Sequence, residues 1–408
     1  TELTKPITIE MWHYMNGGQA EVLNEIIEDF NATNDKGITV NAISQGSIVD
    51  LNKKVISAAQ SNSLPAIINV YPDVATGLIE DKKLVNLSSF INDKNVGMAD
   101  EMDDFVDAFI QETSQWNNGE VYGLPMTKST EVLYVNKNML ESLGYTLEDL
   151  EDLTFEKLAE ISNKAVTELG VAGFGFDSSS NAFISSLKMD GLDFVDSKGT
   201  INVDNEWVRE YMTFFQKQAE SGAFRIAGED KFLSNPFVNQ KMLCYQGSSA
   251  GYAYLNNDGA FEIAVVEVPV FEGKDKAVMQ QGASLFVTNN VSAEAQYAAY
   301  EFVKFATNAE NTAKFATATG YLPVRKSAVE TEIVKNILND ETSLYSQVYN
   351  VAQKSLPYAY YTPAINNAQS ARTVAQEKYE AFMSGSIKDV EVLVDDIVSQ
   401  VQTSIGRN

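Results

Sequence analysis

Few residues of this chain have the types and spacing that covalent or metal chemistry needs. Its single histidine, His13, has no cysteine or acidic cluster beside it, so it does not predict a metal site. No second histidine is present to act with a serine in a catalytic triad, and no pair of carboxylates has a spacing that supports glycoside hydrolysis. Glycine-rich phosphate loops of the GxGxxG or Walker type are also missing. These patterns argue against an enzyme and against nucleotide binding.

Charge and composition narrow the class of protein further. The formal net charge is −26, from 56 acidic and 30 basic residues, with no basic cluster, so nucleic acid and anionic membrane surfaces should repel the chain. Hydrophobic residues make up 44% and aromatic residues 10%, which is enough for a packed interior. No run of about 18 apolar residues predicts a membrane-spanning helix. We expect the one cysteine, Cys244, to be a small buried residue in its apolar run.

Hydrophobic periodicity predicts an α/β chain that opens with a βαβαβ unit. Strands are predicted at 7–12, 38–43 and 66–70, and between them lie helices with one apolar face near 22–30 and at 49–59. This order predicts an open, mostly parallel sheet with helices on both faces. The later elements are predicted as strands at 131–135, 242–245, 262–268 and 282–287 and helices at 137–143, 154–170, 205–221, 293–307, 309–318 and 389–404.

The length of 408 residues and the order of elements predict two discontinuous lobes. The chain is predicted to cross between them three times, near 126–130, 270–282 and 320–326. Lobe 1 would comprise 1–127 and 278–323. Lobe 2 would comprise 128–277 and 324–408, with a helical C-terminal part. Such an arrangement suits a protein that bends about a hinge of several strands.

Six motifs, in this order and spacing, carry a resemblance that covers essentially the whole chain. They are Trp12-His13-x-Met15-x-Gly17, Pro65-Ala66-Ile67 with Val70-Tyr71, Gly123-Leu124-Pro125, Leu133-Tyr134-x-Asn136-Lys137, Gly282-Ala283-Ser284-Leu285 and Thr319-Gly320-Tyr321-Leu322-Pro323. The chain resembles the extracellular solute-binding proteins of family 1, the ligand-capturing subunits of ABC importers. It is most similar to the members that bind sn-glycerol 3-phosphate and glycerophosphodiesters. The resemblance implies a periplasmic-binding-protein-like type II fold, in which two α/β lobes joined by a multi-strand hinge capture a small polar ligand in the cleft between them.

The resemblance also implies which residues bind the ligand. Arg372 falls where those members place the arginine that binds phosphate, and an arginine offers phosphate a planar, bidentate pair of donors. The other positions that match the phosphate pocket are Ser129, one of Ser248 or Ser249, Gly282 and Tyr321. Apart from the resemblance, Arg372 could instead form a surface ion pair with Glu377 or Glu380.

Further candidates come with structural alternatives. Trp12 could face the cleft or pack in the core, and His13 could be structural near the cleft or touch the ligand. Of Tyr245 and Tyr252, we expect one to line the site and the other to pack. The acidic run of Asp103, Asp104 and Asp107 is expected to be a solvated helix face.

Three departures from the family pattern concern the half of the pocket that does not hold phosphate. Ile48 stands where the family often has a tyrosine. Pro72 stands where it has an acidic residue for glycerol hydroxyls, and Asp73 could do that work if the backbone shifts by one residue. The stretch 176–181 has no stacking tryptophan. A different head group on the ligand is therefore expected.

Two rival functions remain open on the sequence. One is an oligosaccharide-binding subunit of a sugar importer, in which Arg372 would be structural. The other, from a different class, is a glycoside hydrolase.

The expected partners are a small phosphoester or sugar and an ABC transporter permease, with no metal, cofactor or nucleic acid, and we expect a monomer. The expected location is extracytoplasmic. It would be a cell-surface lipoprotein in a Gram-positive organism or a periplasmic protein in a Gram-negative one, with the signal segment absent from this chain.

Overall fold

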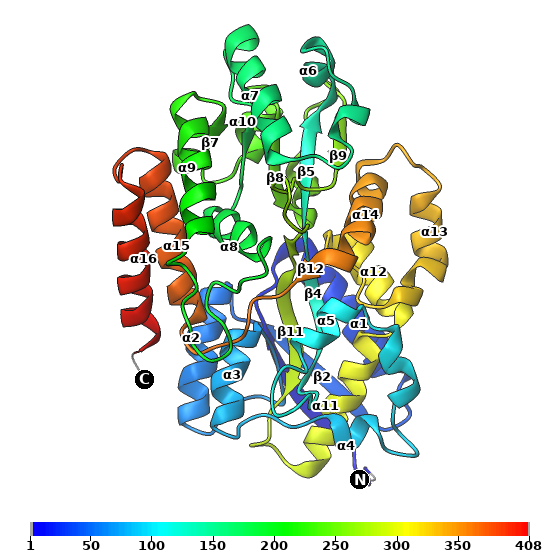
Figure 1. Ribbon diagram of the computed structural model, residues 1–408. Helices are drawn as coiled ribbons and strands as arrows, with labels where there is room; N and C mark the ends of the chain where they lie inside the picture. Colours follow the sequence, from blue (N-terminus) through cyan, green and yellow to red (C-terminus); the bar gives the residue numbers. More distant parts are fainter. Residues whose placement is uncertain (1–2, 407–408) are drawn as a thin grey trace. The chain divides into compact units, whose positions relative to one another are not determined.

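The computed structural model describes residues 3–406, which fold as two compact units (Figure 1). Unit 1 takes the chain up to Ser129 together with Gln281–Asn339. Unit 2 takes Thr130–Gln280 together with the chain from Asp340 onward. The chain therefore passes between the units three times, and the third passage lies at 339/340, beyond the predicted 320–326. No helix within residues 3–406 is both long enough and apolar enough to cross a bilayer.

A five-stranded sheet forms the centre of unit 1. Its strands, in the order β2-β1-β3-β11-β4, are β2 (Ile38–Ser44), β1 (Ile7–His13), β3 (Ile67–Val70), β11 (Gln281–Val287) and β4 (Gly123–Ser129). β1 pairs in parallel with β2 and β3, whereas β11 runs antiparallel to both β3 and β4. The predicted parallel pairing is confirmed for β2, β1 and β3, but the sheet is mixed, because β11 returns to it antiparallel from the second part of the chain.

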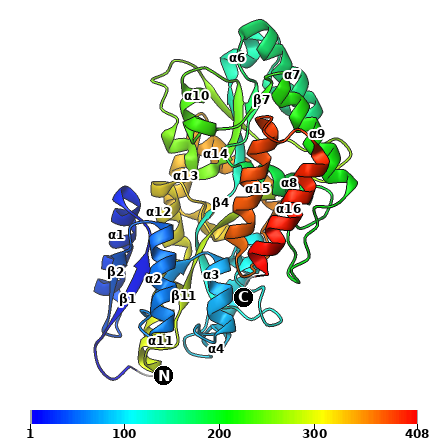
Figure 2. The ribbon, with the colours of Figure 1, turned by 90° about the vertical axis from the view of Figure 1, so that its left-hand side faces the viewer.

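Helices cover both faces of this sheet, as its connections require. α1 (Gly17–Thr33) leads from β1 to β2, and α2 (Ile48–Gln60) leads from β2 across β1 to β3. Because right-handed crossovers in opposite directions place their helices on opposite faces, α1 and α2 flank the sheet (Figure 2). The other helical elements of unit 1 are α3 (Pro72–Glu80), α4 (Ser88–Ile91), η1 (Ala99–Asp104), α5 (Asp107–Glu112), α11 (Ala293–Ala306), α12 (Ala309–Thr319), η5 (Lys326–Glu330) and α13 (Glu332–Leu338).

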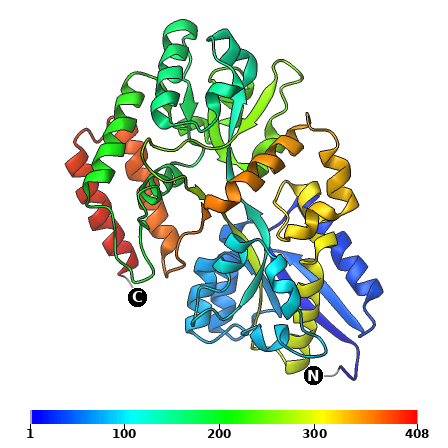
Figure 3. The same ribbon diagram turned by 45° about the vertical axis from the view of Figure 1, so that its right-hand side comes forward.

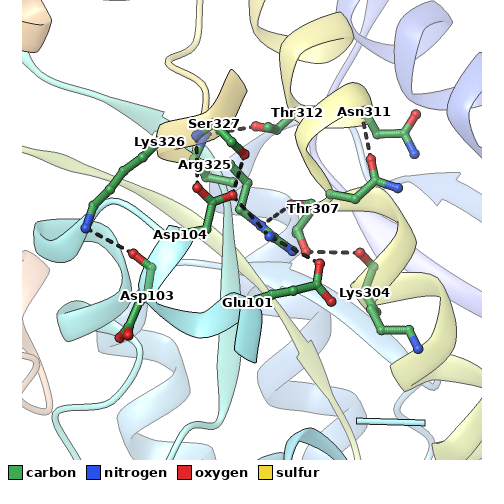
Figure 4. A network of polar contacts seen from close by, with 12 residues as sticks. Glu101, Asp103, Asp104, Lys304, Thr307, Asn311, Thr312, Arg325, Lys326 and Ser327 are labelled. Carbon is green, nitrogen blue, oxygen red and sulfur yellow. Dashed lines mark hydrogen bonds and ion pairs between the residues drawn. The ribbon is translucent and has the colours of Figure 1, made fainter. Parts of the chain in front are cut away.

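Polar contacts explain why residues 324–339, predicted for the second lobe, belong to unit 1. The Val106 N–H donates to the Val324 carbonyl at 2.9 Å. Arg325 is buried, with its guanidinium directed toward Asp104 and the Thr307 carbonyl (Figure 4). The segment after α12 is thus fixed to the acidic run that precedes α5.

The same contacts correct the expectation that this acidic run is simply a solvated face. The Asp104 carboxylate accepts hydrogen bonds from the backbone N–H of Ser327 at 2.9 Å and from its hydroxyl at 2.5 Å. Asp107 pairs with Lys326 at 3.0 Å, but both of these side chains are exposed. Only part of the run therefore conforms to the expectation, because Asp104 is committed to holding the chain in place.

Unit 2 is built around a three-stranded antiparallel sheet in the order β8-β5-β9, from β8 (Cys244–Ser248), β5 (Glu131–Asn136) and β9 (Ile263–Val266). Two parallel strand pairs join β6 (Phe174–Gly175) with β7 (Phe224–Arg225) and β10 (Val278–Met279) with β12 (Ala359–Tyr360). Its helical elements are α6 (Lys137–Ser142), η2 (Leu147–Leu150), α7 (Phe155–Leu169), α8 (Ser179–Lys188), α9 (Glu206–Glu220), η3 (Gly228–Asp230), α10 (Ser234–Val238), η4 (Ser249–Tyr254), α14 (Leu344–Ser355), η6 (Leu356–Tyr358), α15 (Ala368–Met383) and α16 (Val390–Ile405). β8 begins at Cys244, two residues later than the predicted start at 242, and Cys244 is buried as expected.

Local signals set the bounds of the helices that were predicted best. The Thr154 hydroxyl accepts the Lys157 N–H at 3.1 Å and begins α7, and Gly170 ends it in the left-handed conformation, with φ +66°. Asp389 caps α16 in a similar way. The predicted helices at 154–170 and 389–404 match these bounds because the side chains at their ends, or the lack of one, act on the adjacent backbone.

The helix that carries Arg372, α15, is anchored by its opposite face. Ala371, Val374, Ala375, Tyr379 and Phe382 of this helix are all buried. The Tyr379 ring meets the aromatic core of unit 2 at Phe215, with ring centroids 6.0 Å apart. α15 and α16 lie beside α9 in two views of the molecule (Figures 1 and 3). This packing fixes the backbone from which Arg372 projects.

The acidic contacts of unit 1 lead to a first prediction. Asp104→Ala should lower the free energy of unfolding by about 2–3 kcal/mol, because it removes the acceptor of the Ser327 N–H and hydroxyl and one of the carboxylates that face the buried Arg325. Asp107→Ala is the matched control and should cost less than about 1 kcal/mol, because its ion pair with Lys326 is exposed. Urea unfolding of the two variants measures the difference, and equal losses would contradict it.

Candidate functional site

The predicted residues of unit 1 gather at one edge of its sheet. β1, β3 and β4 all end there, and the antiparallel β11 begins there. Ligands of open α/β sheets bind at the carboxyl ends of the strands. This topology brings together five predicted residues from distant parts of the sequence: Trp12, His13, Asp73, Ser129 and Gly282. Tyr321 joins them because the next residue, Leu322, donates its N–H to the Lys128 carbonyl at 2.8 Å.

Tyrosine hydroxyls add donors at this edge, and two of these tyrosines, Tyr14 and Tyr71, were not among the predicted site residues. The Tyr14 hydroxyl lies 2.9 Å from Oγ1 of Thr127. Burial raises the pKa of Tyr14 well above its usual range, and the nearby phenols of Tyr321 and Tyr71 add to the effect. We call Tyr14, Tyr71 and Tyr321 the tyrosine group. Phenol hydroxyls of this kind can donate hydrogen bonds to phosphate or sugar oxygens.

His13 and Trp12 are more buried than a ligand contact requires. His13 is 2% exposed, and its Nδ1 accepts the Met15 N–H at 3.0 Å. Burial lowers the pKa of His13 from 6.5 to about 4, so its ring is neutral at pH 7. Trp12 is 7% exposed, and Lys54 Nζ lies 4.6 Å from its ring centroid. The structural alternatives considered for both residues agree with these surroundings, and their contact with a ligand stays a prediction.

Backbone geometry accounts for Gly282. Its φ is +146°, and a Cβ at this position would lie 1.8 Å from the Thr127 carbonyl oxygen. The close approach occurs beside the irregularity between β4 and β11 at Ala283 and Ser284. Glycine is therefore required at this position for the sheet itself, whether or not a ligand approaches it.

Two other predicted residues occupy well-defined backbone positions. Ser129 is the last residue of β4. Lys128, the residue before it, is wholly buried and forms an ion pair with Glu112. Asp73 follows Pro72 in the first turn of α3, where the helix N-terminus favours a carboxylate. Asp73 thus has a structural reason for its position in addition to the predicted contact with hydroxyls.

In unit 2, the structure distinguishes the two candidate serines. Ser249 is fully buried. Its hydroxyl accepts the Thr130 N–H at 3.1 Å, and its own N–H donates to the Thr130 carbonyl at 2.8 Å. Ser248 is half-buried and caps η4 by accepting the Ala250 N–H at 3.1 Å. Ser249 therefore serves the fold, and Ser248 is the better candidate for a ligand.

The neighbouring tyrosines differ in the same way. Tyr245 is buried against Tyr134, with ring centroids 5.2 Å apart. Tyr252 is half-buried, with its ring against Tyr345 at 5.5 Å. Tyr245 thus packs, and Tyr252 is left as the candidate to line a site.

Arg372 belongs to a polar network that joins three elements of unit 2. Its Nη2 donates to Oδ1 of Asn181 at 2.7 Å, and Nδ2 of Asn181 donates to the Glu131 carboxylate at 3.2 Å. Nε2 of Gln246 donates to the other oxygen of Glu131 at 3.1 Å. Tyr360 completes the surroundings, and its hydroxyl lies 2.7 Å from the Ser185 hydroxyl. Burial raises the pKa of the Tyr360 phenol, the charge of Glu131 raises it further and the charge of Arg372 lowers it. We call Glu131, Asn181 and Arg372 the Glu131–Asn181–Arg372 chain.

The buried carboxylate of this chain has an unusual environment. Burial raises the pKa of Glu131, while its hydrogen bonds from Gln246 and Asn181 act in the opposite direction. Asp177 nearby raises the pKa of Glu131 further, and Arg372 lowers it.

Sequence reasoning missed Glu131, Asn181 and Gln246. The acidic residue inside an otherwise apolar strand, Glu131-Val132-Leu133-Tyr134-Val135, was the available signal.

The alternative partners of Arg372 have other roles. Glu380 lies on the same helix, and its carboxylate accepts a hydrogen bond from the Ser179 hydroxyl at 3.1 Å. Glu377 is exposed. A cavity of about 30 Å³ lies beside Arg372 and Tyr360, and the ion pair of Lys188 and Asp193 (2.8 Å) also lines it.

Comparisons with known proteins agree with this architecture. The cyclic α-maltosyl-1,6-maltose binding protein of Arthrobacter globiformis has a TM-score of 0.82 at 18% identity, covering 99% of this chain and 100% of that one. UgpB from Mycobacterium tuberculosis, solved in complex with glycerophosphocholine, has a TM-score of 0.81 at 20% identity, covering 99% of each chain. These likenesses confirm the predicted fold, which is that of the two-lobed α/β periplasmic binding proteins.

Sequence comparison identifies the family. Residues 25–340 match the model described as bacterial extracellular solute-binding protein, and the chain belongs to this family. A curated relative, the sn-glycerol-3-phosphate-binding periplasmic protein UgpB of Rhizobium meliloti (strain 1021), is 23% identical over 98% of this chain and 94% of its own length. The predicted family is therefore confirmed. The chain is a solute-binding protein of an ABC importer, a class of transport component that performs no catalysis.

The environment of His13 gives a second prediction. NMR titration of this single histidine should give a pKa near 4, since its ring is buried and its Nδ1 is occupied by the Met15 N–H. Below pH 6.5 the unfolded chain binds a proton at His13 that the folded chain does not bind until about pH 4. His13 therefore lowers the free energy of unfolding as the pH falls from 6.5 to 4.

The control variant is His13→Asn, whose side-chain oxygen can still accept the Met15 N–H. The stability of the wild type relative to this variant should fall by roughly 1–3 kcal/mol across that window. Carboxylates with shifted pKa values, such as Glu131 and Asp177, are common to both proteins and cancel in the difference. A titration midpoint near 6.5 would contradict the structural role of the ring.

Proposed function

We propose that this solute-binding protein captures a small phosphoester, sn-glycerol 3-phosphate or a glycerophosphodiester, with Arg372 as the main anchor of the phosphate. The observation that carries the proposal is the orientation of Arg372. Its guanidinium is half-buried on a helix fixed to the core, and Nη2 is held by the uncharged amide of Asn181 at 2.7 Å. A guanidinium offers phosphate a planar, bidentate pair of charged donors.

Further donors are proposed from both units. The Ser248 hydroxyl and the Tyr252 ring of unit 2 are half-buried, and Ser129 and the tyrosine group lie at the carboxyl edge of the unit 1 sheet. Binding would select the arrangement of units in which both sets of groups reach the ligand, which is how a hinged binding protein couples capture to closure. The full length over which UgpB of Rhizobium meliloti aligns with the chain supports the choice of ligand class.

The second candidate ligand is an oligosaccharide. The Arthrobacter globiformis protein, whose fold is similar over its whole length, binds a cyclic maltosyl-maltose. The tyrosine group also offers rings and hydroxyls of the kind that sugars need. In this case Arg372 would hold the structure of unit 2 and contribute little to binding.

We further propose the cellular setting that the family implies. The protein would act as a monomer outside the cytoplasm and deliver its ligand to an ABC permease. In a Gram-positive organism it would be tethered as a surface lipoprotein, and in a Gram-negative one it would be periplasmic.

Calorimetric titration with sn-glycerol 3-phosphate tests the ligand class and the anchor together. Arg372→Ala should weaken binding by at least about 30-fold, or about 2 kcal/mol, the usual loss for a charge-assisted partner. The matched control is Arg209→Ala, which removes a surface arginine of unit 2 that pairs with Asp204 and Glu391, and it should leave affinity unchanged. Wild-type affinity in Arg372→Ala, or saturable binding of maltotriose alone, would contradict the phosphoester proposal.

A further inference from the structure

In the Glu131–Asn181–Arg372 chain, the direction of the hydrogen bonds allows only Asn181 to link the other two residues. Both carboxyl oxygens of Glu131 accept hydrogen bonds from amide NH₂ groups, and the guanidinium of Arg372 only donates them. The amide of Asn181 donates with Nδ2 to Glu131 at 3.2 Å and accepts with Oδ1 from Arg372 at 2.7 Å. Because Glu131 requires a donor, it determines which way the amide faces, and the amide oxygen is then directed at Arg372.

Glu131 and Asn181, the first two members of the Glu131–Asn181–Arg372 chain, are held rigidly. Glu131 begins β5 and is 6% exposed, and Asn181 lies in the first turn of α8 and is 1% exposed. The Asn181 N–H also donates to the cap residue Ser178 at 3.2 Å. Gln246 of β8 holds the second carboxylate oxygen, and within residues 3–406 its own Oε1 is buried without a hydrogen bond. Both amides thus direct their NH₂ groups at Glu131, although this leaves one amide oxygen unsatisfied.

The opposite side of the guanidinium has a weaker neighbour. Nη1 of Arg372 lies 3.5 Å from Sδ of Met279, and a thioether is a poor acceptor. A phosphate oxygen is a far better acceptor than this sulfur. The strong contact with Asn181 therefore orients Arg372, and the weak contact with Met279 is one that a ligand can replace.

We propose that Glu131 is a positioning residue for ligand binding: acting through Asn181, it orients the Arg372 guanidinium toward the ligand without touching the ligand itself. The inference rests on the proposed function of Arg372 and adds the part of unit 2 that makes this arginine effective. It also gives a reason for a carboxylate in a buried strand, where an unpaired charge would be costly.

Two substitutions of Glu131 separate its parts. Glu131→Met removes both acceptors, so the Asn181 amide loses the group that orients it. Glu131→Gln keeps one acceptor for Asn181, and its new NH₂ can donate to Oε1 of Gln246 once that amide turns over. Titration with sn-glycerol 3-phosphate should give about tenfold weaker binding for Glu131→Met and less than about threefold for Glu131→Gln.

A double-mutant cycle distinguishes positioning from a general structural effect. In the Arg372→Ala background, Glu131→Met should change the remaining affinity by less than about twofold, because the residue it positions is gone. The matched control is Glu380→Gln, which removes a carboxylate that also joins α8 to α15, through Ser179, and it should leave affinity unchanged. Equal losses from Glu131→Met in both backgrounds, no loss in either, or no rescue by Glu131→Gln would overturn the inference.

A ligand-free measurement keeps the test valid if Glu131→Met fails to fold. The chain has five arginines, so the ¹⁵N resonances of the Arg372 guanidinium can be assigned by comparison with Arg372→Lys. Restricted rotation, seen as separate Nη signals, is expected in the wild type and in Glu131→Gln. Averaged signals are expected in Asn181→Leu. Identical spectra in the wild type, Glu131→Gln and Asn181→Leu would contradict the Glu131–Asn181–Arg372 chain.

Failure of the proposed function has a different signature. If Arg372→Ala binds sn-glycerol 3-phosphate like the wild type, the phosphate anchor is wrong, and the role of Glu131 fails with it. If Arg372→Ala loses binding and Glu131→Met does not, only the positioning role fails.

Discussion

A guanidinium donates hydrogen bonds and a carboxylate accepts them, and in unit 2 a single amide connects one to the other. Asn181 can do this only because three elements meet at one point: β5 supplies Glu131, α8 supplies the amide and α15 supplies Arg372. The aromatic core beneath these elements fixes their spacing, with Tyr379 of α15 packed against Phe215 of α9. The role that we propose for unit 2 depends on this polar connection between an apolar core and the half-buried guanidinium of Arg372.

In unit 1 the corresponding constraint is the direction of the strands. Because β1, β3 and β4 end at the same edge where β11 begins, backbone groups and side chains from residues near 13, 71, 129 and 282 are brought together. The same geometry requires glycine at 282, where a Cβ would meet the Thr127 carbonyl at 1.8 Å. It also buries His13 so deeply that its ring stays neutral. Some residues of the predicted site thus have structural reasons for their identity that are independent of any ligand.

Sequence reasoning was strongest where the signal was local or periodic. The βαβαβ opening, the Thr154 and Gly170 ends of α7 and the start of α16 after Asp389 were all predicted, because each depends on residues within a turn of one another. The third passage between the units was misplaced, since it depends on Asp104 binding Ser327 across more than 200 positions of sequence.

The Glu131–Asn181–Arg372 chain could not be predicted from the sequence for a similar reason. Arg372 was predicted only by resemblance, and nothing in the sequence connects positions 131, 181 and 372. A buried polar network is specified by the three-dimensional packing of its elements, and periodicity carries no information about it. The single hint was an acidic residue in an apolar strand.

A crystal structure grown with sn-glycerol 3-phosphate would test the central claim most directly. The claim predicts phosphate oxygens at about 3 Å from the Arg372 guanidinium, with Asn181 still bonded to both Arg372 and Glu131. A phosphate bound elsewhere, or an Arg372 that has left Asn181 to reach it, would contradict the claim that this amide sets the position of the anchor.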